Sequence, residues 1–202
     1  MSSDREPSDW RARKKAATRQ AIQDQASRLF LEKGFDATTV EEIAAAAGVS
    51  HMTFFRYFRT KEDVAASDDY DPMIGELVAA RPAGEPVVEK IRQAFLSGLA
   101  QVYATDRDAL LSRYQLILET PSLRARLWEN QNDTQQHIVA ALAGADGQGE
   151  GGLGLEVVVA ACLSTAATAM RVWAENEDST ELPELLDQAF AALREGFGDT
   201  VV

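Results

Sequence analysis

Residues 39–58 leave the chain few ways to fold, because two short helical segments follow each other there with one tight turn between them. The first segment begins at Thr39 and has Glu42 three residues later, which is the spacing of a capping box. Gly48 then provides the turn, and Ser50 is placed to cap the second segment. Two short helices joined by a glycine-containing turn are typical of a helix-turn-helix, although other all-α domains also contain such a pair.

Apolar residues recur at helical spacing along the rest of the chain, and no segment has the sustained alternation expected of a strand. The sequence therefore predicts an all-α protein. The expected helices cover residues 10–33, 39–47, 51–58, 60 to a break near Pro72, 86–104, 106–119, 122–142, 155–176 and 182–197. The glycine-rich stretch 144–154 is expected to be a mobile loop. The apolar run 153–170 is interrupted by Glu156 and several hydroxyl residues, which favours a buried helix over a membrane span.

Charge is distributed unevenly between the start of the chain and the remainder. The 202 residues carry a formal net charge of −12. Residues 10–61 nevertheless hold 10 Lys/Arg and 5 Asp/Glu, whereas residues 62–202 hold 9 and 24. This asymmetry indicates a small basic module joined to a large acidic one. Any contact with nucleic acid is therefore expected in the first third of the chain.

The aromatic run in the second short helix predicts a helix with two kinds of face. At 100° per residue, Phe54 and Phe58 share one face, which we expect to pack on the preceding helices. The other faces are available for a partner. Phe55 stays open between a position on a partner and a position against the first helix.

The order of motifs from residue 34 to residue 64 resembles the N-terminal domain of TetR-family transcriptional regulators. The matching features are Gly34-Phe35, the Thr pair at 38–39, Ile43-Ala44, Gly48-Val49-Ser50, the aromatic run at 53–58 and Lys61-Glu62. The resemblance covers about a quarter of the chain and implies a three-helix DNA-binding domain followed by a larger helical domain. That second domain binds an effector and forms dimers in this family. A narrower similarity to the mycofactocin-type subgroup implies an acyl-CoA-like or hydrophobic effector.

The resemblance divides the chain into three parts. Residues 1–9 are expected to be a disordered leader, 10–60 the helix-turn-helix DNA-binding domain, and 61–202 the effector-binding and dimerisation domain. The second short helix is then the recognition helix. The residues expected to contact DNA bases are His51, Met52 and Arg56, and those expected to contact the DNA backbone are Thr39, Ser50, Thr53, Tyr57 and Lys61. A basic cluster at Arg11, Arg13, Lys14 and Lys15 is read either as a flexible arm for DNA or as a solubilising tail.

In the acidic part, the sequence offers weaker signals for a dimer interface and an effector pocket. The last two helices have more apolar surface than one monomer needs, which favours a homodimer. Polar residues interrupt the apolar stripe of the 122–142 helix, and they either line a cavity or lie in a more exposed stretch. The candidate pocket residues are Tyr103, Arg113, Tyr114, Gln131, Thr134, Met170 and Trp173, with Trp128 and His137 as further possibilities.

Enzymatic signatures are sparse in this sequence. It contains two His and one Cys, and it shows neither a phosphate-binding glycine loop nor a metal-ligand spacing. We therefore expect no enzyme activity, no cofactor and no metal. The expected function is a cytoplasmic, ligand-responsive repressor that is released from a palindromic operator in double-stranded DNA by a small molecule. The alternative is an all-helical dimeric interaction module without specific DNA binding.

Overall fold

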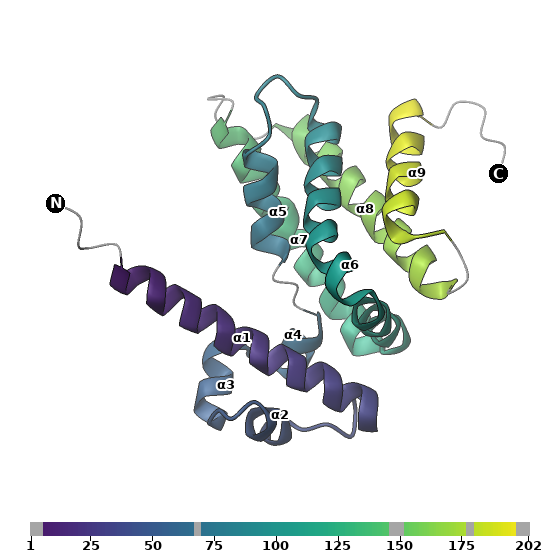
Figure 1. The fold of residues 1–202 in the computed structure, drawn as a ribbon. Coiled ribbons are helices and arrows are strands. Elements are labelled where there is room, and N and C mark those ends of the chain that lie inside the picture. The colour runs from purple at the N-terminus through teal and green to yellow at the C-terminus, as the bar shows by residue number, and fades with distance from the viewer. Residues whose placement is uncertain (1–5, 67–69, 146–151, 177–179, 197–202) are drawn as a thin grey trace. The chain divides into compact units, whose positions relative to one another are not determined.

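The computed structural model describes residues 6–66, 70–145, 152–176 and 180–196, and all regular secondary structure within them is helical (Figure 1). The helices are α1 (Glu6–Lys33), α2 (Val40–Ala46), α3 (His51–Tyr57), α4 (Lys61–Ala66), α5 (Tyr70–Ala79), α6 (Val87–Glu119), α7 (Pro121–Ala145), α8 (Leu153–Glu175) and α9 (Leu182–Glu195). The all-α prediction is confirmed. The helices group into two compact units: unit 1 is Met1–Ser67 with Thr120–Arg126, and unit 2 is Asp68–Glu119 with Leu127–Val202.

Unit 1 is built on the apolar stripe of α1. Ile22, Ala26 and Phe30 are buried at helical spacing, and α2 and α4 pack against this helix. Ile43 and Ala44 of α2 are also buried, where the small Ala44 side chain suits a close crossing with α3. This is the packing that the helical periodicity predicts.

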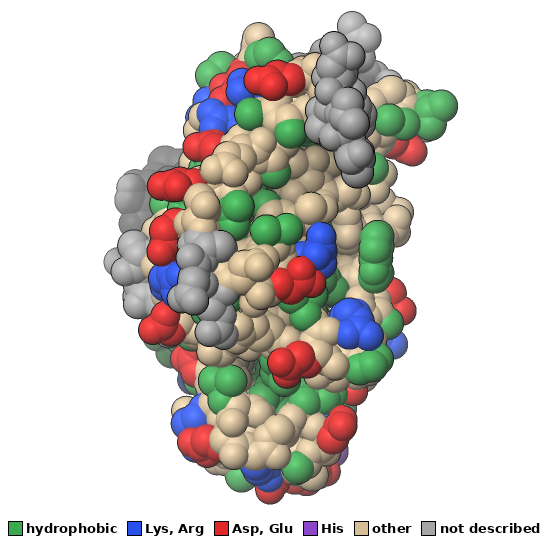
Figure 2. Space-filling view, turned by 90° about the vertical axis from the view of Figure 1, so that its right-hand side faces the viewer, with side chains coloured by type: hydrophobic (Ala, Val, Ile, Leu, Met, Phe, Trp, Pro, Cys, Tyr) green, Lys and Arg blue, Asp and Glu red, His purple; other side chains and the backbone are tan. Residues whose placement is uncertain are grey.

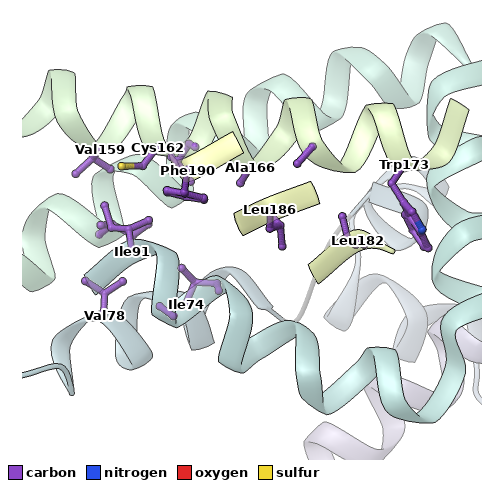
Figure 3. Packing of buried hydrophobic residues seen from close by; sticks show 14 of the residues in the cluster. Ile74, Val78, Ile91, Val159, Cys162, Ala166, Trp173, Leu182, Leu186 and Phe190 are labelled. Atoms are coloured by element: carbon purple, nitrogen blue, oxygen red, sulfur yellow. The ribbon is translucent and has the colours of Figure 1, made fainter. Parts of the chain in front are cut away.

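Unit 2 has a larger apolar core, which α5, α6, α7, α8 and α9 share. Figure 3 shows Ile91 of α6, Cys162 of α8 and Phe190 of α9 pointing toward one another, and all three are fully buried. Trp173 near the end of α8 is also buried. Within the described residues, α8 is a helix long and apolar enough to cross a membrane by length and composition. It packs on α6 and α9 along its buried side, as expected for the core helix of this unit.

One prediction about the helices of unit 2 is wrong. The sequence predicts separate helices over 86–104 and 106–119. The structure has a single 33-residue helix, α6, through both segments. No proline interrupts this stretch, and apolar residues such as Leu99 and Leu110 on both sides of the junction pack on the same core, which favours one continuous helix.

The remaining differences concern helix ends. α1 begins at Glu6, four residues before the expected start, so residues 6–9 of the expected disordered leader are helical. Residues 67–69, between α4 and α5, lie outside the described residues. Pro72, where a break or kink was expected, lies in the first turn of α5, where its missing N–H leaves no helical bond unmade. The middle of the predicted mobile loop, residues 146–151, lies outside the described residues.

Candidate functional site

The turn between α2 and α3 fixes the direction of α3. Gly48 has φ of 66°, a left-handed conformation that glycine adopts without a Cβ clash. The Val49 N–H donates to the Ala44 carbonyl at 2.9 Å. The Ser50 hydroxyl then accepts the Thr53 N–H at 3.1 Å and caps α3 as predicted. These contacts set where α3 leaves the core of unit 1.

Aromatic side chains hold the inner face of α3. Phe54 and Phe58 are buried with ring centroids 5.9 Å apart, which confirms their predicted inward position. Phe58 is the C-cap and has extended backbone, so the helix ends one residue earlier than expected. Arg19 of α1 donates to the Tyr57 carbonyl at 3.3 Å, and its guanidinium carbon lies 4.3 Å from the centre of the Phe58 ring. Both ends of α3 are therefore fixed to unit 1.

The outer face of α3 is open to solvent. Met52 is 81% exposed, and His51 and Arg56 are exposed as well. The His51 Nε2 lies 3.2 Å from a carboxylate oxygen of Glu41 in α2. Phe55 is 43% exposed and meets the His51 ring edge to face at 4.6 Å, so it belongs to the outer surface rather than to the packing against α1. The structure thus brings the three predicted base-contacting residues to one exposed surface.

The side chains predicted to contact the DNA backbone surround this surface, but several already have local partners. Thr39 caps α2: its hydroxyl accepts the Glu42 N–H and donates to the Glu42 carboxylate. The hydroxyls of Ser50 and Thr53 lie 2.9 Å apart. Tyr57 is half-buried at the end of α3, and the Arg56 guanidinium carbon lies 5.6 Å from the centre of its ring. Their contact with phosphate stays a prediction.

Lys61 has a structural role that sequence reasoning missed. Its ammonium donates to the carbonyls of Phe35 at 2.8 Å, Thr38 at 3.2 Å and Asp36 at 3.4 Å, and it lies 4.4 Å from the centre of the Phe35 ring. A lysine has three donors, so these carbonyls match its full capacity. Lys61 therefore ties the start of α4 to the α1–α2 connection, and a contact with phosphate would have to replace one of these bonds. Only the matching Gly34-Phe35 and Lys61 motifs hinted at this pairing.

The cap of α2 contains Glu42, whose pKa differs from the ordinary value of a glutamate. A hydrogen bond from Lys33, with further bonds from the Thr39 backbone and hydroxyl, lowers the pKa of Glu42 to about 2. The ion pair joins the last turn of α1 to the first turn of α2. Glu42 is therefore ionised throughout the physiological range and holds α2 on α1.

Asp63 of α4 links three parts of unit 1. One carboxylate oxygen accepts the backbone N–H groups of Arg59 at 3.0 Å and Thr60 at 3.2 Å. The Thr60 hydroxyl accepts the Asp63 N–H at 3.0 Å in return, which completes a capping box at the start of α4. The other carboxylate oxygen lies 2.7 Å from Nε of Arg126, in the part of α7 that belongs to unit 1. The segment that follows α3 is thereby joined to the start of α7.

In unit 2, two of the predicted pocket residues meet in a polar and aromatic cluster. The rings of Tyr103 and Trp173 lie 5.9 Å apart, and the Arg107 guanidinium carbon is 5.6 Å from the centre of the Trp173 ring. The Tyr103 hydroxyl donates to Glu181, and Arg107 Nε donates to the same carboxylate at 3.1 Å. Arg107 and Glu181 were not predicted. Arg107 follows Tyr103 by one helical turn, but nothing in the sequence pairs either residue with Glu181.

The other pocket candidates have different surroundings within unit 2. Tyr114 is buried, and its hydroxyl lies 3.1 Å from the Met170 sulfur. Thr134 is buried with its hydroxyl donating to the Asn130 carbonyl at 3.0 Å, so an intrahelical bond satisfies it. Arg113 and Gln131 are half-buried on α6 and α7, whereas Trp128 and His137 are exposed.

The described residues contain no group of three or more His, Cys, Asp or Glu side chains that could hold a metal ion. On the face drawn in Figure 2, carboxylates are scattered among hydrophobic side chains. Burial raises the pKa of the Cys162 thiol to about 11, which keeps it protonated and unreactive at neutral pH.

Two sequence families match the chain. Residues 22–67 match "Bacterial regulatory proteins, tetR family", and residues 85–198, more than half of the chain, match "MftR C-terminal domain". The chain is 31% identical to the HTH-type transcriptional regulator TcmR of Streptomyces glaucescens over 144 residues, which are 68% of this chain and 64% of TcmR. This match therefore spans just under two thirds of TcmR.

Two further relatives match over nearly the whole chain. The regulator MftR of Mycobacterium tuberculosis is 26% identical over 187 residues, with 91% of this chain and 93% of MftR covered. The crystal structure of Thermus thermophilus FadR, a TetR-family repressor in complex with lauroyl-CoA, superposes with a TM-score of 0.54 at 28% identity. The superposed region covers 91% of this chain and 95% of the FadR chain.

Proposed function

The chain belongs to the TetR family of bacterial transcriptional regulators, and from this premise we propose that it is a homodimeric repressor released from a palindromic DNA operator by a small-molecule effector. The observation that carries the proposal is the outer face of α3. Buried Phe54 fixes the inner face of α3 to the core of unit 1, while Met52 and Arg56 project from the opposite side of the helix into solvent. Exposed side chains on a rigidly held helix are what reading a major groove requires.

Within this proposal, the outer face of α3 reads sequence and its surroundings set the register. Arg56 is suited to donate two hydrogen bonds to guanine O6 and N7, and Met52 to contact a thymine methyl group. His51 would donate to a base edge or accept from one. The backbone contacts come from Thr39, Ser50, Thr53, Tyr57 and Lys61, with Lys61 exchanging a carbonyl for a phosphate. We retain residues 10–60 as the proposed DNA-binding domain and 61–202 as the effector domain.

A dimer is needed because two recognition helices must enter successive major grooves about 34–36 Å apart. We place the interface on α8 and α9. The side of α8 away from the core carries the exposed Leu153 and Val157, with small residues such as Ser164 further along. An exposed apolar helix face is expected to be covered in the working protein, and a second copy covers it by two-fold symmetry.

The proposed effector is acyl-CoA-like or otherwise hydrophobic. The support is the 28% identity to the Thermus FadR structure, which holds lauroyl-CoA, together with the match to the MftR C-terminal domain. The candidate contacts are Tyr103, Arg113, Tyr114, Gln131, Thr134, Met170 and Trp173, joined by Arg107. Arg107 is half-buried against Trp173 and could receive an anionic group in place of Glu181.

Release of DNA would follow from movement of α4 relative to α3. Asp63 joins α4 to the start of α7, and α7 continues from unit 1 into unit 2. A displacement of α7 on effector binding would thus be passed to the helix that follows the recognition helix. The protein would work in the cytoplasm, where operator DNA and effector are both present.

The test is selection of bound duplexes from a random pool by the purified protein, followed by the same selection with two variants. The wild type is expected to select a palindrome. Arg56→Ala should relax the preference at one base position per half-site, whereas Lys61→Ala should weaken binding to all duplexes alike. Arg28→Ala, on α1 and paired with Glu32, is the control and should leave the selected sequence unchanged.

Failure to select any duplex at low salt, with a folded dimer present, would refute the regulator proposal and favour an interaction module without DNA binding. Equal losses on selected and random DNA with Arg56→Ala would refute the base-reading role alone. The thermal stability of Lys61→Ala must be measured in parallel, because the loss of its carbonyl contacts weakens unit 1 by itself.

A further inference from the structure

The N-terminal turns of α1 carry a basic segment that precedes the buried stripe of this helix. Residues 10–19 hold five Lys/Arg and no Asp/Glu in a chain whose net charge is −12. Residues 13–17 are all exposed, and the buried stripe of α1 begins only at Ile22. This segment is helical and extends the first helix, so of the two readings of the basic cluster the flexible arm does not hold.

We infer that this segment, the α1 arm (residues 10–15), is a second DNA-contacting element that binds the phosphate backbone flanking the half-site read by α3. The inference rests on the proposed function and extends its DNA interface beyond the helix-turn-helix. Its partner is duplex DNA, recognised through phosphate charge and not through base edges.

The direction of the arm follows from the spacing of three residues on α1. Lys15, Arg19 and Ile22 are four and three residues apart and therefore share one helix face. Ile22 is fully buried in unit 1, and Arg19 donates to the Tyr57 carbonyl at 3.3 Å, at the end of α3. Figure 1 shows α3 on one side of α1. Lys15 lies one turn further on the face that carries Arg19, so helical geometry directs it to the side of α1 on which the end of α3 lies.

The reach of the arm matches the spacing of phosphates. At 1.5 Å per residue, Lys15 lies about 6 Å and Trp10 about 14 Å beyond Arg19 along the helix axis. Phosphates follow each other at about 3.4 Å along the axis of each strand, so the arm can pass three to four of them. Trp10 is 57% exposed, and the Lys14 ammonium lies 5.1 Å from the centre of its ring.

A basic helix can also bind an anionic membrane, but the composition of the arm favours DNA. Membrane-surface helices need a wide apolar face, and between Trp10 and Arg19 the other apolar residues are alanines. The link between Arg19 and the end of α3 places the arm beside the surface already proposed to meet DNA.

The experiment compares the full-length wild type with Lys14→Gln/Lys15→Gln by fluorescence anisotropy on the selected palindrome. One duplex ends at the palindrome and the other continues for eight base pairs on each side. The wild type should bind the longer duplex more tightly, and the variant should bind both equally. Each lost phosphate contact lowers the slope of log K against log salt by about 0.9, so two contacts per protomer lower it by about 1.8. The affinity loss on the longer duplex is then about tenfold larger per protomer at 50 mM than at 200 mM salt.

The matched control compares Lys15→Gln with Arg28→Gln, an exposed position at the other end of the same helix that loses the same charge. Gln and Lys have similar helix propensities, so circular dichroism should stay unchanged. Arg28→Gln should keep the advantage of the longer duplex. If the wild type binds the two duplexes equally, or if both single variants behave alike, the arm proposal is refuted while the regulator proposal stands.

Two other outcomes also decide the question. If no duplex is selected at all, both proposals fail. If Lys14→Gln/Lys15→Gln leaves DNA binding intact but abolishes sedimentation with phosphatidylglycerol vesicles, the arm belongs to a membrane surface and the DNA inference is wrong.

Discussion

Replacing Asp63 by alanine should destabilise unit 1 more than any exposed charge change in it. The substitution removes the acceptor for two backbone N–H groups at the start of α4 and breaks the 2.7 Å contact with Arg126. Loss of such a helix cap costs about 1 kcal/mol. The Asp63 and Arg126 side chains are 11% and 36% exposed, so their pair should contribute about 1 kcal/mol, at the upper end of the range for exposed pairs. We therefore expect Asp63→Ala to lower the free energy of unfolding by about 2 kcal/mol.

The assay is amide hydrogen exchange in the full-length chain, read on the amides of α2, α3 and α4. This measurement reports the opening free energy of unit 1 separately from that of unit 2. A double-mutant cycle with Asp63→Ala and Arg126→Ala should give a coupling energy of about 1 kcal/mol. The cycle of Asp63→Ala with Arg28→Ala, which lies in a different ion pair of unit 1, should be additive.

Additive effects of Asp63→Ala and Arg126→Ala, to within about 0.4 kcal/mol, would refute the claim that this pair couples α4 to α7. Asp63→Asn separates the two roles of the carboxylate. It keeps an oxygen that can cap α4 but removes the charge that attracts Arg126. A loss as large as that of Asp63→Ala would mean that the ion pair, and not the cap, carries the effect.

Lys33 and Thr39 hold the pKa of Glu42 near 2, below its ordinary value, so the stabilising effect of the ionised Glu42 is complete above about pH 4.5 and is lost as the pH falls toward 2. Glu42→Gln should therefore remove the acid-induced loss of protection when hydrogen exchange in α2 is measured against pH. An unchanged loss of protection in this variant would contradict the assignment. The pKa of the Cys162 thiol, near 11, predicts that iodoacetamide at pH 8 labels the folded chain only as fast as unit 2 opens, so labelling at the rate of a free thiol would show that the site is accessible. Trp173→Ala should cost about 3–5 kcal/mol of unit 2 stability, read as faster exchange along α8, with exchange in unit 1 as the internal control.

The sequence alone determined the features that depend on neighbours within one or two helical turns. The caps at Thr39 and Ser50 form as predicted because their partners, Glu42 and Thr53, lie three residues away. The inward position of Phe54 also follows from periodicity, since one face of a short helix must bury its apolar residues. The all-α fold and the helix-turn-helix rest on these local rules.

The tertiary structure decided the features whose partners are distant in the chain. Lys61 donates to carbonyls 23 to 26 residues away, and Tyr103 meets Glu181 78 residues later, so no local pattern could pair them. The continuity of α6 past Asp106 is likewise a packing outcome, because both of its halves bury apolar residues in one shared core. Every residue has a backbone carbonyl, so the sequence does not show which carbonyl a distant side chain will contact. A long side chain reaches such a partner only once helices far apart in sequence have packed together.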